Sequence, residues 1–113
     1  MNWNMLVLKI IIHNIYMLEL YCLKNCYYCD NSLRLCKVYN IPHKVIFIEQ
    51  NNKEKYKKKH KMDTFPQIFL MTKQNKYLIG GNEHFEYLIS IMDMISKFKF
   101  NINIINAFQQ YFK

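Results

Sequence analysis

A pair of cysteines separated by two residues lies between an apolar run and a helical pattern. The apolar run covers residues 17–21, the pair is Cys26 and Cys29, and the helical pattern extends from 30 to 39. A Cys-x-x-Cys pair between a strand and a helix is typical of a redox-active dithiol. The unpaired N–H groups and positive dipole end of a helix N-terminus favour a thiolate over a thiol. We therefore expect Cys26 to be a thiolate nucleophile and Cys29 its resolving partner.

Two further cysteines leave a metal site as an alternative. Cys22, Cys26 and Cys29 have the spacing of radical-SAM cluster ligands, and Cys36 would supply a fourth thiolate. A radical-SAM barrel needs a much longer chain than these 113 residues, which excludes that class. A structural zinc site stays open. However, Cys22 continues a strand and Cys36 falls in an apolar stripe, where free cysteine behaves as a small hydrophobic residue. We expect no metal.

Composition limits the domain count and the class of partner. The 113 residues are the size of one domain, and a hydrophobic fraction of 51% allows a core without staples or metal. The net charge of +8 favours anionic partners. Arg34 is the one arginine among 16 basic residues, whereas base and phosphate recognition relies on arginine forks. Nucleic acid is therefore a disfavoured partner.

The N-terminal apolar run, residues 5–12, is a poor targeting or membrane segment. It contains Lys9 and is shorter than the roughly 20 apolar residues that span a bilayer. A basic lead-in and a small-residue cleavage site, which mark a signal peptide, are missing. Four cysteines without a secretory signal indicate a reducing compartment. We expect a cytoplasmic protein with no membrane partner.

The pattern along the chain predicts alternating strands and helices. Apolar runs predict strands at 16–21, 44–48, 67–71 and 76–79. Helical patterns cover 26–40, 52–62 and 82–97, with Asn52 and Asn82 as caps. Asn40 and Pro42 end the first helix, and the last two strands form an antiparallel hairpin. The order β-α-β-α-β-β-α predicts an α/β fold, with a four-stranded mixed sheet and helices on both faces.

The ends of the chain extend beyond this unit. Residues 1–16 form an extension, read as an amphipathic helix with a strand as the alternative. Residues 17–97 are the domain, and 98–113 are a helical segment packed on the same domain.

Two further motifs stand out in the second half of the chain. Thr64-Phe65-Pro66 opens a predicted strand, where a proline ordinarily marks only a strand boundary. Gly80 and Gly81 are the only two glycines of the sequence. Such a pair indicates backbone with positive φ or a close approach to a ligand.

The Cys26-Tyr27-Tyr28-Cys29 block, the Thr64–Phe69 block and Ile79-Gly80-Gly81, in this order, resemble the motifs of a dithiol glutaredoxin. The resemblance covers residues 17–88. It implies a thioredoxin-like fold and glutathione-dependent thiol–disulfide exchange in cell redox homeostasis and electron transport. The implied substrates are protein disulfides and glutathione mixed disulfides, with glutathione as co-substrate. The protein would act as a monomer.

The resemblance also implies roles for individual residues. Cys26 becomes the nucleophile and Cys29 the resolving thiol. Phe65 would pair through its main chain with the cysteinyl part of glutathione, and Pro66 would follow a cis peptide bond. Glutathione would be bound by Lys24, Tyr28, Phe65, Pro66, Gly81, Asn82 and Glu83. Within this set, Asn82 and Glu83 would hold the γ-glutamyl end at a helix N-terminus.

The chain departs from the family pattern at several positions. Tyr27 replaces the usual proline, and Leu23 stands where a basic residue is common, with Lys24 displaced by one. Met62 stands where Gln or Arg is frequent, and His84 where a second acid is common. The group that would hold the glycyl carboxylate of glutathione is therefore the least well matched part of the site.

Three other functions stay open. The chain could be a thioredoxin-like protein reduced by a flavoenzyme reductase, or a dimer binding a [2Fe-2S] cluster through Cys26 and glutathione. It could also be a basic interaction module with a vestigial site. The lysine-rich run 53–61 reads as a solvated helix face, or as a surface that steers anionic substrates. Large DNA viruses with AT-rich genomes also carry glutaredoxins. A viral source would place the protein in the host cytoplasm or the virus particle.

Overall fold

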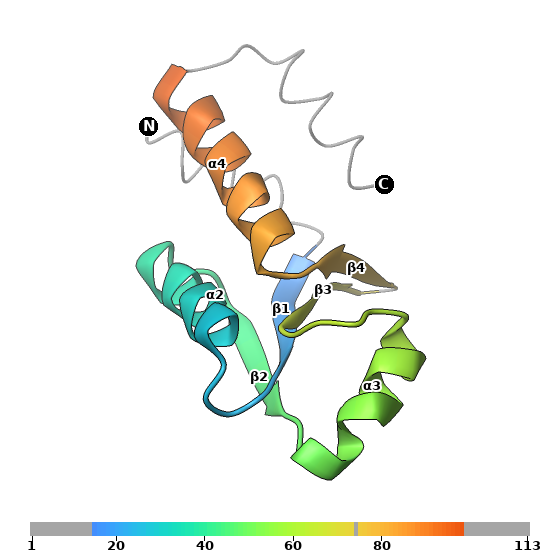
Figure 1. Cartoon of the computed structure of the whole chain (residues 1–113). Helices are drawn as coiled ribbons and strands as arrows, with labels where there is room; N and C mark the ends of the chain where they lie inside the picture. The colour runs from blue at the N-terminus through green and yellow to red at the C-terminus, as the bar shows by residue number, and fades with distance from the viewer. Residues whose placement is uncertain (1–14, 74, 99–113) are drawn as a thin grey trace.

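Four strands form one mixed sheet in the computed structural model, which describes residues 15–73 and 75–98 (Figure 1). The strands are β1 Ile15–Cys22, β2 His43–Phe47, β3 Gln67–Thr72 and β4 Lys76–Gly80. Their order in the sheet is β2-β1-β3-β4. Strand β1 is parallel to β2 and antiparallel to β3, and β3 and β4 are antiparallel. The predicted mixed sheet and hairpin are confirmed.

The helices follow the predicted order. They are α2 Tyr27–Val38, the short 3-10 helix η1 Gln50–Asn52, α3 Lys53–His60 and α4 Asn82–Phe98. Figure 1 shows α2 and α4 together on one side of the sheet and α3 on the other. The predicted α/β architecture with helices on both faces is therefore confirmed. Within the described ranges, none of the helices is long and apolar enough to cross a membrane.

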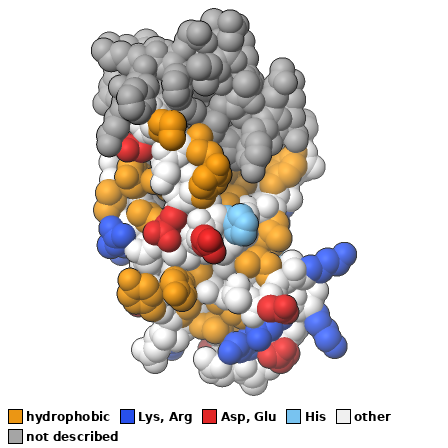
Figure 2. All heavy atoms as spheres, turned by 45° about the horizontal axis from the view of Figure 1, so that its top comes forward, with side chains coloured by type: hydrophobic (Ala, Val, Ile, Leu, Met, Phe, Trp, Pro, Cys, Tyr) orange, Lys and Arg blue, Asp and Glu red, His pale blue; other side chains and the backbone are white. Residues whose placement is uncertain are grey.

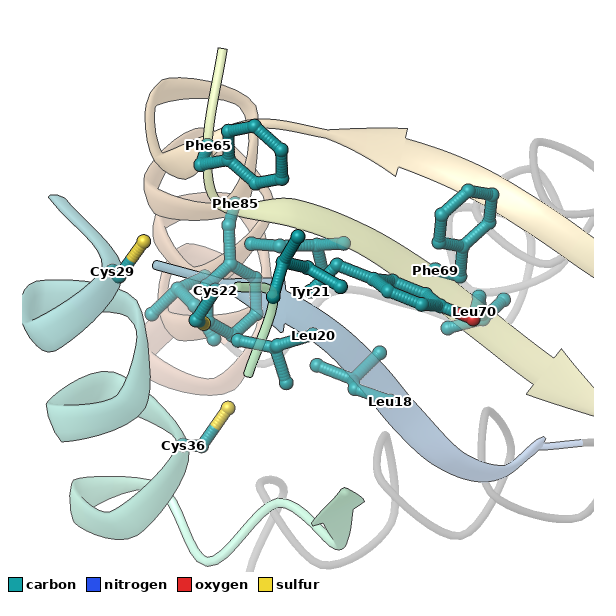
Figure 3. Packing of buried hydrophobic residues seen from close by; sticks show 13 residues of the cluster. Leu18, Leu20, Tyr21, Cys22, Cys29, Cys36, Phe65, Phe69, Leu70 and Phe85 are labelled. Atoms are coloured by element: carbon teal, nitrogen blue, oxygen red, sulfur yellow. The ribbon is translucent and has the colours of Figure 1, made fainter. Parts of the chain in front are cut away.

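The hydrophobic core lies between the sheet and the two helices α2 and α4 that cover one of its faces (Figure 3). Side chains alternate across a strand, so Leu18, Leu20 and Cys22 share one face of β1. All three are buried with Cys29, Cys36 and Phe85 from α2 and α4. The register places Leu18 opposite Leu70 and Leu20 opposite Ile68 of β3. This face of β1 is apolar because it is covered completely by helices.

The other face of β1 carries an aromatic cluster under α3. The ring of Tyr21 lies 4.5 Å from that of His60 and 5.7 Å from that of Phe69, between ring centroids. Glu19 occupies the same face, where its carboxylate accepts from the Lys76 ammonium at 2.9 Å and from the Tyr21 hydroxyl. A charged residue is tolerated in this central strand because its charge is paired and hydrogen-bonded.

Two helix ends show how local sequence sets the boundaries. Helix α2 stops before Asn40, whose φ of 54° is left-handed, so the predicted stop is confirmed. Helix α3 is shorter than the predicted 52–62. The 3-10 turn precedes it, and Asn52 makes no side-chain cap hydrogen bond, contrary to the predicted cap. Lys61, with φ 54°, ends it.

The predicted terminal segments lie almost entirely outside the described residues. Residues 15 and 16, assigned to the N-terminal extension from the sequence, belong instead to β1. Residue 98, assigned to the C-terminal segment, belongs to α4. The strand boundary differs because the pairing of Ile15 with Thr72 extends the ladder of β1 with β3.

Candidate functional site

Cys26 is the N-cap residue of α2. Its backbone is extended, and its Sγ accepts a hydrogen bond from the backbone N–H of Cys29 at 3.2 Å. The carbonyl of Cys26 accepts from the N–H of Asp30 at 2.9 Å, which begins the helix. Cys26 is half-buried and Cys29 is fully buried. The pair thus consists of an outer and an inner thiol, which no disulfide joins in this structure.

The loop before β3 meets the first turn of α2. The thiol of Cys26 lies 3.8 Å from the carbonyl oxygen of Phe65, toward which it can donate. The Phe65–Pro66 peptide bond is cis, as expected. The structure therefore brings the Cys26 sulfur and the main chain of Phe65 together.

A buried amide anchors this loop. Gln67, the first residue of β3, is fully buried. Its Nε2 donates to the carbonyl of Met62 at 3.2 Å, and its Oε1 lies 2.7 Å from Nδ1 of His60. This pairing makes Nδ1 of His60 the donor. Nε2 of His60 is buried without a hydrogen-bond partner among the residues described. No spacing signal in the sequence joins these residues, so this bridge could not be predicted.

A pocket of about 480 Å³ opens beside the pair. Its lining residues are Tyr28, Met62, Thr64, Phe65, Gly81, Asn82, Glu83, His84 and Glu86. It gathers most of the predicted glutathione-binding residues, namely Tyr28, Phe65, Gly81, Asn82 and Glu83. Lys24 and Pro66 are not in the lining: Lys24 is exposed on the turn before Cys26, and Pro66 is buried. Glu86 is an additional lining residue that the sequence analysis did not identify.

The pocket is lined by acidic side chains. Glu83 and Glu86 line it together with His84, whereas none of its lining residues within the described ranges is Lys or Arg. Figure 2 shows acidic side chains gathered beside a histidine on one face, with most of the visible Lys and Arg side chains elsewhere on it. The predicted role of Lys24 as a pocket ligand is therefore not supported by its position.

The Asn82 side chain connects two helices. Its Oδ1 accepts from Nδ2 of Asn31 at 2.9 Å and from the hydroxyl of Ser32 at 2.7 Å. Its Nδ2 donates to the carboxylate of Glu86 at 2.9 Å. Because these bonds occupy the amide, Asn82 can offer a ligand its backbone N–H, one of the first N–H groups of a helix that lack helical partners.

Of the two glycines, Gly80 has the positive φ that the sequence predicts. Gly80 has φ +129°, and a Cβ there would lie 2.9 Å from Nδ1 of His84. Gly81 lines the pocket, with Pro66, Met62 and Thr64 at ordinary contact distances from an added Cβ. Gly80 thus turns the chain from β4 into α4, and Gly81 forms part of the pocket wall.

Burial raises the pKa of Cys26 to about 11. The neighbouring Cys29 thiol also raises this pKa, while the backbone N–H groups of Cys29 and Tyr28 lower it. The Cys22 thiol and burial raise the pKa of Cys29 well above its ordinary value. The direction of this pKa shift runs against the expected resting thiolate at Cys26. Desolvation outweighs the stabilisation that the helix N-terminus supplies.

Across the described part of the chain, no three His, Cys, Asp or Glu side chains converge as metal ligands. No protein-family model matches the sequence, and no curated protein matches it.

Proposed function

We propose that the chain is a glutathione-dependent thiol–disulfide oxidoreductase of glutaredoxin type, built on a thioredoxin-like fold. The observation that carries this proposal is the 3.8 Å approach of the Cys26 thiol to the Phe65 carbonyl. It places a half-exposed thiol at a helix N-cap beside main chain that can pair with an extended peptide. Phe65 and Tyr28 also line the pocket, so a bound thiol compound would lie close to Cys26.

The proposed cycle uses Cys26 as the nucleophile. Its thiolate attacks the glutathione sulfur of a mixed disulfide; a Cys26–glutathione bond forms, and the substrate leaves as a thiolate that takes up a proton. A second glutathione then attacks the glutathione sulfur of that disulfide, which releases Cys26 and forms glutathione disulfide. For a protein disulfide, the Cys26 thiolate attacks one substrate sulfur; a Cys26–substrate disulfide forms, and the other substrate sulfur leaves and takes up a proton. Cys29 then attacks Sγ of Cys26, which releases the second substrate thiol and leaves a Cys26–Cys29 disulfide. Glutathione reduces this disulfide and is itself oxidised to glutathione disulfide.

The surrounding groups support each step. The N–H of Cys29, at 3.2 Å, stabilises negative charge on the Cys26 sulfur when it forms. The raised pKa keeps the thiolate fraction small at neutral pH, although a more basic thiolate is also the stronger nucleophile. Glu83 in the pocket would pair with the α-ammonium group of glutathione.

The acidic pocket favours a second candidate, a thioredoxin-like protein reduced by a flavoenzyme. Glutathione carries two carboxylates, and the pocket lining offers no Lys or Arg among the described residues to receive them.

Turnover of one disulfide substrate, coupled either to glutathione with its reductase or to a thioredoxin reductase, separates the two functions. Faster turnover with glutathione is the expected result. Turnover confined to thioredoxin reductase would establish the second candidate.

A further inference from the structure

The inner thiol of the pair has a second thiol beside it. Cys22 is the last residue of β1, Cys29 lies in the first turn of α2, and both are fully buried in the same core cluster. A hydrogen bond with the Cys22 thiol is the largest cause of the raised pKa of Cys29. Figure 3 shows Cys29 pointing from α2 toward the sheet, with Cys22 at the adjoining end of β1.

Cys29 is influenced by both of the other thiols of the site. The Cys22 thiol raises the pKa of Cys29 and the Cys26 thiol lowers it, while the Cys29 thiol raises the pKa of Cys26. Cys26 is half-buried, whereas Cys29 and Cys22 are fully buried. Thiol–disulfide exchange proceeds by attack of one sulfur on a disulfide sulfur, and a sulfur that interacts with two other thiols allows such an exchange.

Cys36, the remaining cysteine, does not share this property. It lies seven residues after Cys29 in the same helix, which separates the two Cα atoms by about 10 Å. A disulfide requires Cα atoms closer than about 7 Å. Cys36 therefore provides a matched buried thiol that cannot form a disulfide with Cys29.

We propose that Cys22 is a third redox thiol of the site, which exchanges with the Cys26–Cys29 disulfide to form a Cys22–Cys29 disulfide. In this step the Cys22 sulfur attacks Sγ of Cys29, the Cys22–Cys29 bond forms and the Cys26–Cys29 bond breaks. Cys26 leaves with the electron pair and takes up the proton that Cys22 gives up. Nothing is oxidised or reduced overall. The inference rests on the proposed function, which supplies the Cys26–Cys29 disulfide.

The exchange would change what the oxidised protein presents to solvent. A Cys26–Cys29 disulfide has one half-buried sulfur, whereas a Cys22–Cys29 disulfide has both sulfurs in the core. Oxidising equivalents would then be held out of reach of external thiols, while Cys26 would return to its free form. The oxidised protein would keep a nucleophile for glutathione mixed disulfides.

The test uses the full chain with Cys26→Ser, a substitution that leaves a favourable N-cap residue on α2. The variant is treated with diamide, which oxidises two thiols to a disulfide and takes up their two hydrogens. Peptide mapping by mass spectrometry should identify a Cys22–Cys29 link within one chain, with equal loss of both thiols. Adding Cys36→Ala should leave this link unchanged, and adding Cys22→Ala should abolish it.

Free thiols at Cys22 and Cys29 in oxidant-treated, folded Cys26→Ser protein would overturn the inference, as would a link that joins two chains. Circular dichroism identifies the folded protein. This readout needs no glutathione, so it separates the two proposals. Loss of wild-type turnover with glutathione would refute the proposed function alone, and an absent Cys22–Cys29 link would refute the third thiol alone.

Discussion

The thiol of Cys26 lies 3.8 Å from the carbonyl oxygen of Phe65, a residue 39 positions away in the sequence. The sheet register explains the contact. Tyr21, near the end of β1, pairs with Gln67 at the start of antiparallel β3. The loop that leaves β1 and the loop that enters β3 must therefore lie side by side. The site is a direct consequence of placing β1 next to β3 in the sheet.

Replacing Cys29 with Ser should separate two activities. Turnover of a glutathionylated peptide should stay close to wild type, because glutathione itself can resolve the Cys26 mixed disulfide. Reduction of a protein disulfide such as insulin should fall to background, because the resolving thiol is gone. Cys36→Ala, at an equally buried cysteine, is the control and should preserve both activities. Equal loss of both activities in Cys29→Ser would contradict the assigned roles.

The reactivity of Cys26 should increase with pH well into the alkaline range. Burial raises the pKa of Cys26 to about 11, and the thiolate is the reactive form. Below the pKa, each pH unit therefore raises the thiolate fraction about tenfold. We expect the rate of iodoacetamide labelling at Cys26 to rise log-linearly from pH 7 to about 10. A labelling rate that no longer rises above pH 7 would place the pKa of Cys26 below 7. It would show that stabilisation of the thiolate by the helix N-terminus outweighs the effect of burial.

The sequence was sufficient to predict the strands, helices and redox pair because each has a local pattern. Residues 16–21 are apolar, the cysteine spacing matches one helical turn, and Asn40 with Pro42 marks a helix end. The α/β order then determined which loops could meet.

The rest of the site depends on side-chain choices that local patterns do not encode. Asn82 was expected to hold a ligand at the helix N-terminus, a role that its backbone N–H can still fill. Its side-chain amide bonds to Asn31 and Ser32, across a helix contact that spacing could not reveal. Glu86 could have been predicted as a site residue, because it lies one helical turn after Asn82 on the same helix. Both residues line the pocket, and their side chains are hydrogen-bonded. The bridge between His60 and Gln67 joins a helix to a strand without any sequence periodicity.

Gly80→Ala should destabilise the fold by about 1–3 kcal/mol, the usual range for a residue forced into glycine-only backbone space. The φ of +129° disfavours any side chain, and the new Cβ would lie 2.9 Å from the His84 ring. Urea denaturation measures the change in the free energy of unfolding. Gly81→Ala is the matched control, because its Cβ would make ordinary contacts. An equal loss in both variants would argue against the backbone explanation.

The Glu19–Lys76–Tyr21 cluster should make stability depend on pH at both extremes. Burial raises the pKa of Glu19, but hydrogen bonds from Tyr21 and Lys76 outweigh it, so the net shift is downward. That stabilisation is present above the unfolded pKa of about 4.3 and is lost as pH falls through the folded value. The pKa values of Tyr21 and Lys76 are raised, so their contribution is lost above about pH 10.

Glu19→Gln tests the ionic contribution of this cluster through the free energy of unfolding between pH 3 and 7. The variant should lose about 1 kcal/mol or less at pH 7, since Lys76 is partly exposed. Its difference from wild type should shrink toward pH 3. Glu54→Gln, which removes an exposed carboxylate paired with Lys57, should change little across the same range. A constant difference between wild type and Glu19→Gln at all pH values would contradict the ionic origin.

Glutathione-coupled disulfide turnover by wild type and by Cys26→Ser, at equal protein concentration, tests whether Cys26 is the nucleophile. Serine preserves the N-cap of α2 but removes the nucleophilic sulfur. We expect turnover by the wild type and by Cys36→Ala, and a Cys26→Ser rate no higher than that of glutathione without protein. Wild-type turnover retained by Cys26→Ser would contradict the assignment of Cys26 as the nucleophile.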